Sequence, residues 1–450
     1  MTTATLPAAL LLAIAMTGTA QAAPPAAQEP RAQSEQSSPA ELAARFLDHL
    51  DAGRYERAVA MFDATLRDAL PADKLKAAWE GVPAQAGPLQ RRGEATVQSA
   101  NGRSSVTIPL HYEKVALQAA IATDAEGRIG GFQLRTVPPP APVISDPVPV
   151  DAPYVERDAK VGTGERALPG TLALPKGEGP FPGVVLVHGS GPHDRDESIG
   201  PNKPFSDIAR GLAERGIAVL RYDKRVKVRP QDYADGVTVD TEVTDDAVAA
   251  VAALRATPGI DAKRVFVLGH SLGGMMAPRI ATRAKADGMI LFAAPSRPLL
   301  DLLLEQVQRM AVLDDGKTSP EEAARISTLR AQIAAARGSA EVPASDLPLG
   351  QSQAYWRSIE AVDPVKEAVT TTLPILIVQG GRDIQVVDAD WQRWKASFEG
   401  DRKATLKLYD SLSHLGIAGE GPGGPQDYAV AGHVDARLIA DLAEWIKAQQ

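Results

Sequence analysis

The later two thirds of the chain alternates short apolar runs with segments of helical periodicity. Residues 183–187 (GVVLV) are apolar without interruption, which is typical of a strand buried on both faces of a sheet. Further runs predict strands at residues 168–174, 217–222, 264–268, 289–293, 374–378 and 405–409. Helical periodicity is found between them and after them, at residues 205–215, 239–256 and 435–447. This alternation predicts a mostly parallel sheet with helices on both faces.

One long interval, residues 296–372, interrupts the alternation. Its leucine and alanine residues recur at helical spacing in LLDLLLEQVQRM and in PEEAARISTLRAQIAAA, so it predicts helices and not strands. An insertion between two strands of an open sheet lies at the carboxyl edge of the sheet, where ligands bind. We therefore expect the interval to form a helical cap.

Residues 38–136 have a different pattern, with helices first and strands afterwards. Ser38-Pro39-Ala40-Glu41 combines an N-cap, a proline at the first helical position and an early acid, which together predict a helix start. Further helices are expected at residues 55–66 and 72–79, and strands at residues 94–99, 105–111, 115–123 and 129–134. This order predicts a small α+β domain.

The remaining segments predict a secreted protein whose small N-terminal domain lies between a flexible tether and a linker. Residues 1–22 are expected to be a signal peptide, because an apolar core too short to span a bilayer precedes the small-x-small pattern Ala20-Gln21-Ala22. Residues 23–37 predict a flexible tether, and the proline-rich residues 137–153 a stiff linker before a domain at 154–450. We expect a periplasmic or secreted protein without a membrane span after cleavage; a retained N-terminal anchor is the alternative.

Composition excludes several classes of function. The 450 residues carry a net charge of −8 and contain no basic block, so nucleic acid is not an expected partner. Cysteine is absent, which excludes disulfides, thiolate metal sites and a cysteine nucleophile. Neither a metal nor an oligomeric state is indicated by the pattern.

The strongest chemical signal is Gly269-His270-Ser271-Leu272-Gly273, between the predicted strand at residues 264–268 and a helix-compatible segment. In this strand-to-helix context G-x-S-x-G forms a sharp turn that exposes the serine above the sheet. A simple glycine turn is the alternative. We predict that Ser271 is a nucleophile.

A serine nucleophile needs a histidine base and a carboxylate that orients the base, and in this fold they follow in the order serine, acid, histidine. Asp383 comes directly after a predicted strand, whereas Asp388 and Asp390 suit the start of a helix. His414 lies in a loop after the last strand, whereas His433 is at the start of the last helix. We predict Asp383 as the acid and His414 as the base.

Acyl transfer also needs N–H donors for the negatively charged oxygen of the tetrahedral intermediate. The N–H of Leu272 is one expected donor, and the loop after residue 187 supplies the other. Ser190 is the first choice in that loop and Gly191 the second, while His188 is expected to support the loop without reacting.

Other polar and aromatic clusters have two interpretations each. PHDRD (residues 192–196) could hold a metal but more simply orders its loop or lies at the rim of the pocket. Residues 221–225 end a strand and form either an ion-pair network or a contact with an anionic substrate. Tyr355 and Trp356 either line an acyl pocket as substrate-binding residues or pack in the core.

These motifs, with the run VVLVHGSGPHDRDESIGPNKPFSDIARGLAERGIAVLRYDKR, resemble a family of secreted bacterial serine α/β-hydrolases. The family is related to dienelactone hydrolases and serine aminopeptidases and is usually described as esterases. The resemblance spans residues 150–450 and implies Ser271, Asp383 and His414 as the triad. Dienelactone hydrolases use a cysteine nucleophile, which this chain lacks, so their substrate is not implied. Residues 38–136 resemble a domain of unknown function that precedes such hydrolases.

We therefore expect an α/β-hydrolase with a helical cap that cleaves small-molecule carboxylic esters through an acyl-enzyme, without a cofactor. The resemblance implies short acyl chains. An exopeptidase or an acyltransferase would use the same triad. A protein of another class, in which residues 38–136 bind a glycan, peptide or partner in the cell envelope and the hydrolase half is vestigial, is the remaining alternative.

Overall fold

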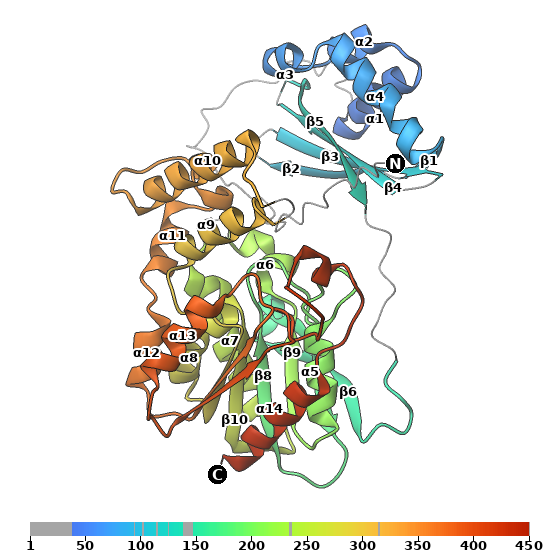
Figure 1. Cartoon of the computed structure of the whole chain (residues 1–450). Coiled ribbons are helices and arrows are strands. Elements are labelled where there is room, and N and C mark those ends of the chain that lie inside the picture. The colour runs from blue at the N-terminus through green and yellow to red at the C-terminus, as the bar shows by residue number, and fades with distance from the viewer. Residues whose placement is uncertain are drawn as a thin grey trace, which may run out of the picture. The chain divides into compact units, whose positions relative to one another are not determined.

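The computed structural model describes residues 38–93, 95–100, 103–113, 116–124, 126–137, 147–233, 236–313 and 316–449. The chain divides into two compact units at residues 141 and 142 (Figure 1), and each is described by itself. The predicted signal peptide and tether lie outside the described residues, as does most of the predicted linker. Within the described part of the chain, no helix is long and apolar enough to cross a membrane.

The smaller unit places helices against an antiparallel sheet, as the sequence pattern predicts. The helices are α1 (Pro39–Asp51), α2 (Tyr55–Val59), α3 (Ala64–Ala69) and α4 (Ala72–Ala86). The strands are β1 (Leu89–Arg92), β2 (Thr96–Ala100), β3 (Arg103–Tyr112), β4 (Ala116–Thr123) and β5 (Ile129–Val137), in the order β1-β3-β4-β5 with β2 also paired to β3. The helix start at Ser38 is confirmed: its hydroxyl and the Glu41 carboxylate form a reciprocal capping box.

Two predictions in this unit were wrong in detail. The single helix expected at residues 55–66 is two short helices, because Phe62 forms a β-bridge with Ile129 and Asp63 caps the second helix. Strand β1 was not predicted, since its sequence LQRR has no alternating apolar face and its pairing with β3 alone defines it. Tertiary contacts decide both features, and local sequence does not encode them.

The larger unit contains the predicted sheet. Its eight strands follow the order β13-β12-β11-β10-β8-β9-β7-β6, and all neighbours are parallel except β6 with β7 and β7 with β9. The strands are β6 (Tyr154–Val161), β7 (Leu168–Pro175), β8 (Phe181–Val187), β9 (Ala218–Tyr222), β10 (Ile260–His270), β11 (Gly288–Phe292), β12 (Ile375–Gly380) and β13 (Ala404–Tyr409). The mostly parallel sheet is thus confirmed, and β6 is an edge strand that the apolar pattern did not indicate.

Helices cover both faces of this sheet. They are α5 (Pro204–Ala213), α7 (Asp245–Arg255), α8 (Leu272–Ala284), α13 (Asp388–Ser397) and α14 (Ala436–Ala448), while the short helix α6 (Arg225–Val228) follows β9 without buried residues. Helices α5 and α14 pack on one face, while α7, α8 and α13 pack on the other. Successive residues of the central strands alternate between these two cores, for example Val184 and Leu186 in one and Val185 and Val187 in the other. Burial on both faces explains why the runs are continuously apolar.

The interval between β11 and β12 is helical, as its periodicity predicts. It contains α9 (Leu299–Met310), α10 (Pro320–Arg337), α11 (Gln353–Glu360) and α12 (Pro364–Thr370). In Figure 1, α9, α10 and α11 lie together beyond one end of the sheet. Ile333 of α10 and Ile359 of α11 belong to the same buried cluster as Leu272 of α8. Helix α12 packs directly against α8, the helix that follows the candidate nucleophile.

Candidate active site

Ser271 occupies a strained turn between β10 and the helix α8. Its backbone has φ of 53° and ψ of −118°, a conformation that residues with a side chain rarely adopt. A side chain at Gly269 would meet the carbonyl of Gly273, and one at Gly273 would meet the carbonyl of Val187. Both motif glycines are thus required by close backbone approach, and the turn presents Ser271 at the carboxyl end of a central strand.

Asp383 follows β12, and both oxygens of its carboxylate have hydrogen-bond partners. Its Oδ1 accepts bonds from the N–H groups of Gln385 and Val386, at 2.8 and 3.0 Å. Its Oδ2 accepts a bond from the amide of Gln379 at 3.1 Å and lies 2.7 Å from Nδ1 of His414. The side chain has no exposed surface. These hydrogen bonds hold the carboxylate in a fixed position facing the imidazole.

His414 lies in the loop after β13, and glycines bring this loop against the end of β12. A side chain at Gly381 would lie 2.8 Å from the Cα atom of Asp410, and one at Gly380 would meet the carbonyl of Leu412. Neither glycine has a positive φ. They therefore permit two backbones to approach each other closely.

The three predicted residues lie at the same edge of the sheet, where Asp383 and His414 are in direct contact. Strands β10, β11, β12 and β13 are parallel neighbours, so the residues that follow them lie at the same edge. A direct contact joins the turn after β10 to the loop after β13: Nε2 of His270 lies 2.9 Å from the carbonyl oxygen of His414. The residue beside Ser271 therefore holds the backbone of the candidate base.

The loop after β8 lies beside the candidate nucleophile, where an oxyanion donor is needed. A Cβ atom at Gly189 would be 3.0 Å from Cβ of Ser271 and 3.6 Å from its hydroxyl oxygen. Within the described part of the chain, the N–H groups of Ser190, Gly191 and Leu272 have no hydrogen-bond acceptor. All three predicted donors thus remain available, and the preference for Ser190 over Gly191 stays a prediction.

A buried acid that the sequence analysis missed connects these loops. One carboxylate oxygen of Glu197 accepts a 2.6 Å bond from the N–H of Gly189, and the other lies 2.9 Å from Nδ1 of His270. Because His270 also bonds the carbonyl of His414, the network runs from the candidate oxyanion loop to the candidate base. No spacing rule marks Glu197, which lies in an irregular loop with a positive φ of 51°.

The pair of Glu197 and His270 is ionised by mutual attraction. Burial by itself raises the pKa of Glu197, but the imidazoles beside it, above all His270, lower that pKa from 4.5 to about 2. Burial lowers the pKa of His270, and the Glu197 carboxylate more than offsets this, so the pKa is raised above 6.5. The stability that the pair contributes is fully present between these two ordinary values. It is lost in acid as Glu197 is protonated, and in alkali as His270 loses its proton.

A pH-dependent loss of stability is expected for Glu197→Gln. The variant removes one partner of a buried ion pair, which costs about 3 kcal/mol in the free energy of unfolding. Without the carboxylate, burial lowers the pKa of His270 instead, so the difference from the wild type should be larger at pH 5.5 than at pH 9. Thermal unfolding of both proteins at the two pH values measures this, with the exposed Glu214→Gln as a control. An equal or larger difference at pH 9 would show that the pair is not ionised.

The histidines and acids of the same loop act as local supports. His188 is buried, its Nε2 bonds the carbonyl of Asp194 at 2.9 Å, and burial lowers its pKa to about 3. Nε2 of His193 bonds the carbonyl of Ser190 at 2.6 Å. The carboxylate of Asp194 accepts two backbone N–H bonds from its own loop. Among described residues, no group of acids and histidines is arranged to hold a metal ion. The loop-ordering interpretation of PHDRD fits these contacts.

Each charged residue in the range 221–225 forms an ion pair within the protein. Arg221 pairs with Glu156 and Asp196, and Asp223 pairs with Arg195. Arg225 pairs with Asp232 and Asp246, and Lys224 with Glu242. This arrangement fits the ion-pair network and not contact with an anionic substrate.

Tyr355 and Trp356, the predicted substrate-binding residues, are both buried in α11. The indole N–H of Trp356 donates to the carbonyl of Pro348 at 3.1 Å, and both rings belong to the core shared with α8. These contacts favour packing, and the acyl-pocket role stays a prediction.

The rejected alternatives for acid and base have other partners. His433 is exposed, and its Nδ1 lies 3.0 Å from Asp207 of α5. Asp390 is fully buried in α13, where it accepts the N–H of Ser296 and pairs with Arg297. Asp388 starts the same helix. None of them contacts His414 or Ser271 in the hydrogen bonds of the described residues.

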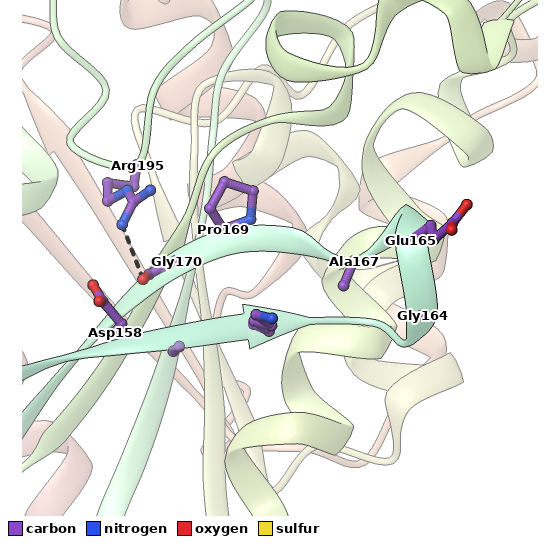
Figure 2. A pocket seen from close by; sticks show the side chains of 9 residues that line it. Asp158, Gly164, Glu165, Ala167, Pro169, Gly170 and Arg195 are labelled. Carbon is purple, nitrogen blue, oxygen red and sulfur yellow. Dashed lines mark hydrogen bonds between the residues drawn. The ribbon is translucent and has the colours of Figure 1, made fainter.

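A cavity of about 740 Å³ lies away from these residues (Figure 2). It is formed largely by β6, β7 and the turn between them, with Arg195 at its rim, at the edge of the sheet opposite β13. Arg195 is bound to the carbonyl of Gly170 and to Asp223, as Figure 2 partly shows. None of the candidate catalytic residues lines this cavity, so it is not the place of the chemistry described above.

A mostly parallel sheet with a strained serine after one strand, and a paired aspartate and histidine after two neighbouring strands, defines the α/β-hydrolase class. Residues 180–420, more than half of the chain, match the family described as "Serine aminopeptidase, S33". The chain belongs to this family. Residues 43–132 match a second family, described as "Protein of unknown function (DUF3887)".

Individual proteins are also similar to this chain. The chain is 36% identical over 403 residues to Esterase EstD of Thermotoga maritima, which covers 89% of this chain and 93% of the relative. A solved esterase of Pyrococcus furiosus has 17% identity and a TM-score of 0.43, with 69% of this chain and 97% of that chain covered. An acylaminoacyl peptidase of Pyrococcus horikoshii has 14% identity and a TM-score of 0.44, with 79% and 56% covered. The similarity to EstD includes both units of this chain.

Proposed function

We propose that this protein is a serine esterase in which Ser271 is the nucleophile, His414 the base and Asp383 the acid that orients the base. The observation that carries the proposal is the 2.7 Å contact of Nδ1 of His414 with Asp383, at the same sheet edge as the strained Ser271. In a serine triad, an acid placed at Nδ1 of the histidine holds the tautomer that leaves Nε2 free to accept the proton of the serine.

The first half of the reaction forms an acyl-enzyme. His414 takes the hydroxyl proton of Ser271 as the oxygen attacks the ester carbonyl, and the imidazolium that results is stabilised by Asp383. The N–H groups of Leu272 and of Ser190, with Gly191 as the alternative, donate to the oxyanion. His414 then gives its proton to the departing alcohol, which leaves Ser271 acylated.

The second half releases the acid. Water takes the place of the alcohol, His414 removes one of its protons, and the oxygen attacks the acyl carbonyl in the same oxyanion site. When the tetrahedral intermediate collapses, Ser271 recovers its proton from His414. This sequence uses no cofactor.

The preference for esters over amides is expected from the similarity to Esterase EstD, and short acyl chains from the family resemblance. We expect kcat/KM for p-nitrophenyl acetate and butyrate to exceed that for aminoacyl p-nitroanilides, and to fall as the acyl chain grows to eight carbons or more. Steady-state assays with both series measure this. The family description favours an aminopeptidase as the second candidate. Faster cleavage of the anilides would establish that function and overturn the proposed one.

We also propose that the protein is exported to the periplasm or the medium by cleavage of residues 1–22. The support is the apolar core followed by Ala20-Gln21-Ala22 in the sequence. Intact-mass analysis of the protein from its native host should give a chain that begins at residue 23 or 24. A protein that retains Met1 would contradict export by cleavage.

A further inference from the structure

Lys224 places a buried ammonium group on the loop that borders Ser271. The residue is only 3% exposed, and it follows β9. Its Nζ donates to the carbonyl oxygen of Gly189 at 2.8 Å and to the carboxylate of Glu242 at 2.6 Å. Removing an ammonium group from water costs several kcal/mol, and a buried ion pair seldom repays this as stability alone. A lysine in this position therefore calls for a role besides stability.

The contact with Gly189 fixes the direction of the next N–H group. In a planar trans peptide the carbonyl and the following N–H point in opposite directions. Because the carbonyl of Gly189 is directed at Nζ of Lys224, the N–H of Ser190 is directed away from it. Glu197 holds the N–H of Gly189 on the preceding peptide, so the loop is fixed by a buried acid and a buried base.

We propose that Lys224 is a positioning residue that orients the N–H of Ser190 toward the oxyanion. This inference rests on the proposed function, since it assigns a residue to the oxyanion site of that reaction. Lys224 does not touch the substrate. It acts through the peptide of Gly189 and Ser190, and its positive charge polarises that peptide so that the N–H becomes a stronger donor.

Helix α11 of the insertion is connected to the residues that surround Lys224. Tyr355 of α11 is buried near Glu242, and burial together with the charge of this carboxylate raises the pKa of that tyrosine. A second contact nearby joins the N–H of Val239 to the hydroxyl of Ser358 in the same helix, at 2.9 Å. Helix α11 therefore lies against the segment that carries Glu242, the acid that pairs with Lys224.

The test is Lys224→Met, which keeps the length of the side chain and removes the charge. With p-nitrophenyl acetate we expect kcat to fall roughly tenfold to a hundredfold, somewhat less than the loss of a whole oxyanion donor, and KM to stay close to that of the wild type. Affinity for phenylboronic acid, whose tetrahedral adduct with serine carries an oxyanion, should fall with kcat. Each kcat is expressed per active site, counted by complete titration with a fluorophosphonate, so that partial unfolding does not enter.

A second variant separates positioning from stability. Lys224→Met leaves the buried Glu242 without its positively charged partner, whereas the double variant with Glu242→Gln removes that unpaired charge. We expect the double variant to unfold at a higher temperature than Lys224→Met and still to have the low kcat. Arg225→Met is the matched control, since it also breaks ion pairs, with Asp246 and Asp232, that are largely shielded from solvent, and Arg225 forms no hydrogen bond with Gly189. Its kcat per active site should equal that of the wild type.

The outcomes are decisive in each direction. A low kcat in both Lys224 variants, with unchanged KM and weaker boronate binding, supports the inference. Recovery of kcat in the double variant, or an equal loss in Arg225→Met, assigns Lys224 to stability alone and overturns it, as does a wild-type kcat in Lys224→Met. If the wild type itself neither cleaves the ester nor reacts with the fluorophosphonate, the proposed function fails, and that result is distinct from the others.

Discussion

Replacement of Ser271 by alanine is expected to lower kcat for p-nitrophenyl acetate by about a millionfold, the typical effect of removing the nucleophile of a serine triad. The expected loss is this large because no other group can form the acyl-enzyme. The neighbouring N–H donors and His414 would remain in place, but they would act only on direct attack by water. KM is expected to change little, since the hydroxyl contributes mainly to the transition state.

Two controls accompany this result: the thermal stability of the variant, and the replacement of a second, exposed serine. Alanine removes one hydroxyl from a turn whose strain comes from the backbone, so the midpoint of thermal unfolding should stay near that of the wild type. Ser339→Ala, at an exposed position outside the sheet, should keep full activity. If Ser271→Ala kept more than a small fraction of the wild-type kcat, the nucleophile would be another residue.

Asp383→Asn is expected to lower kcat by about ten thousandfold with little change in fold. The asparagine fills the same volume and can still accept the N–H bonds of Gln385 and Val386 through its oxygen. Its amide would face Nδ1 of His414 as a donor, which favours the tautomer with the proton on Nε2. A histidine protonated there cannot act as the base for Ser271.

The matched control is Asp388→Asn, because Asp388 comes five positions later and is exposed at the start of α13. Its kcat is expected to equal that of the wild type. Steady-state kinetics across pH 5 to 10 compare the three proteins. Equal activities for Asp383→Asn and the wild type, or a large loss in Asp388→Asn, would move the acid to another position.

Most of the larger unit could be predicted because its strands are buried on both faces. Runs such as residues 183–187 are apolar throughout, and Gly269 and Gly273 complete the G-x-S-x-G motif in a strand-to-helix context. The order of the loops along a parallel sheet then limits the acid and the base to residues that follow later strands. This is why Asp383 and His414 could be selected over Asp390 and His433 from the sequence.

The supporting residues could not be predicted, because their roles depend on contacts between distant parts of the chain. Glu197 and Lys224 are both charged residues in polar stretches, where exposure to solvent is the usual expectation. Their burial becomes apparent only when the loops after β8 and β9 fold against the turn of Ser271. Sequence patterns identify groups that react more easily than groups that hold them.

The central claim is that the residues after β10, β12 and β13 form one catalytic unit with Ser271 as its nucleophile. Reaction of the intact protein with a fluorophosphonate, followed by digestion and peptide mass spectrometry, tests it most directly. The account predicts a single adduct on Ser271, which should form far more slowly in His414→Ala. An adduct on any other residue would contradict it. So would a protein that the fluorophosphonate inactivates fully while Ser271 stays unmodified.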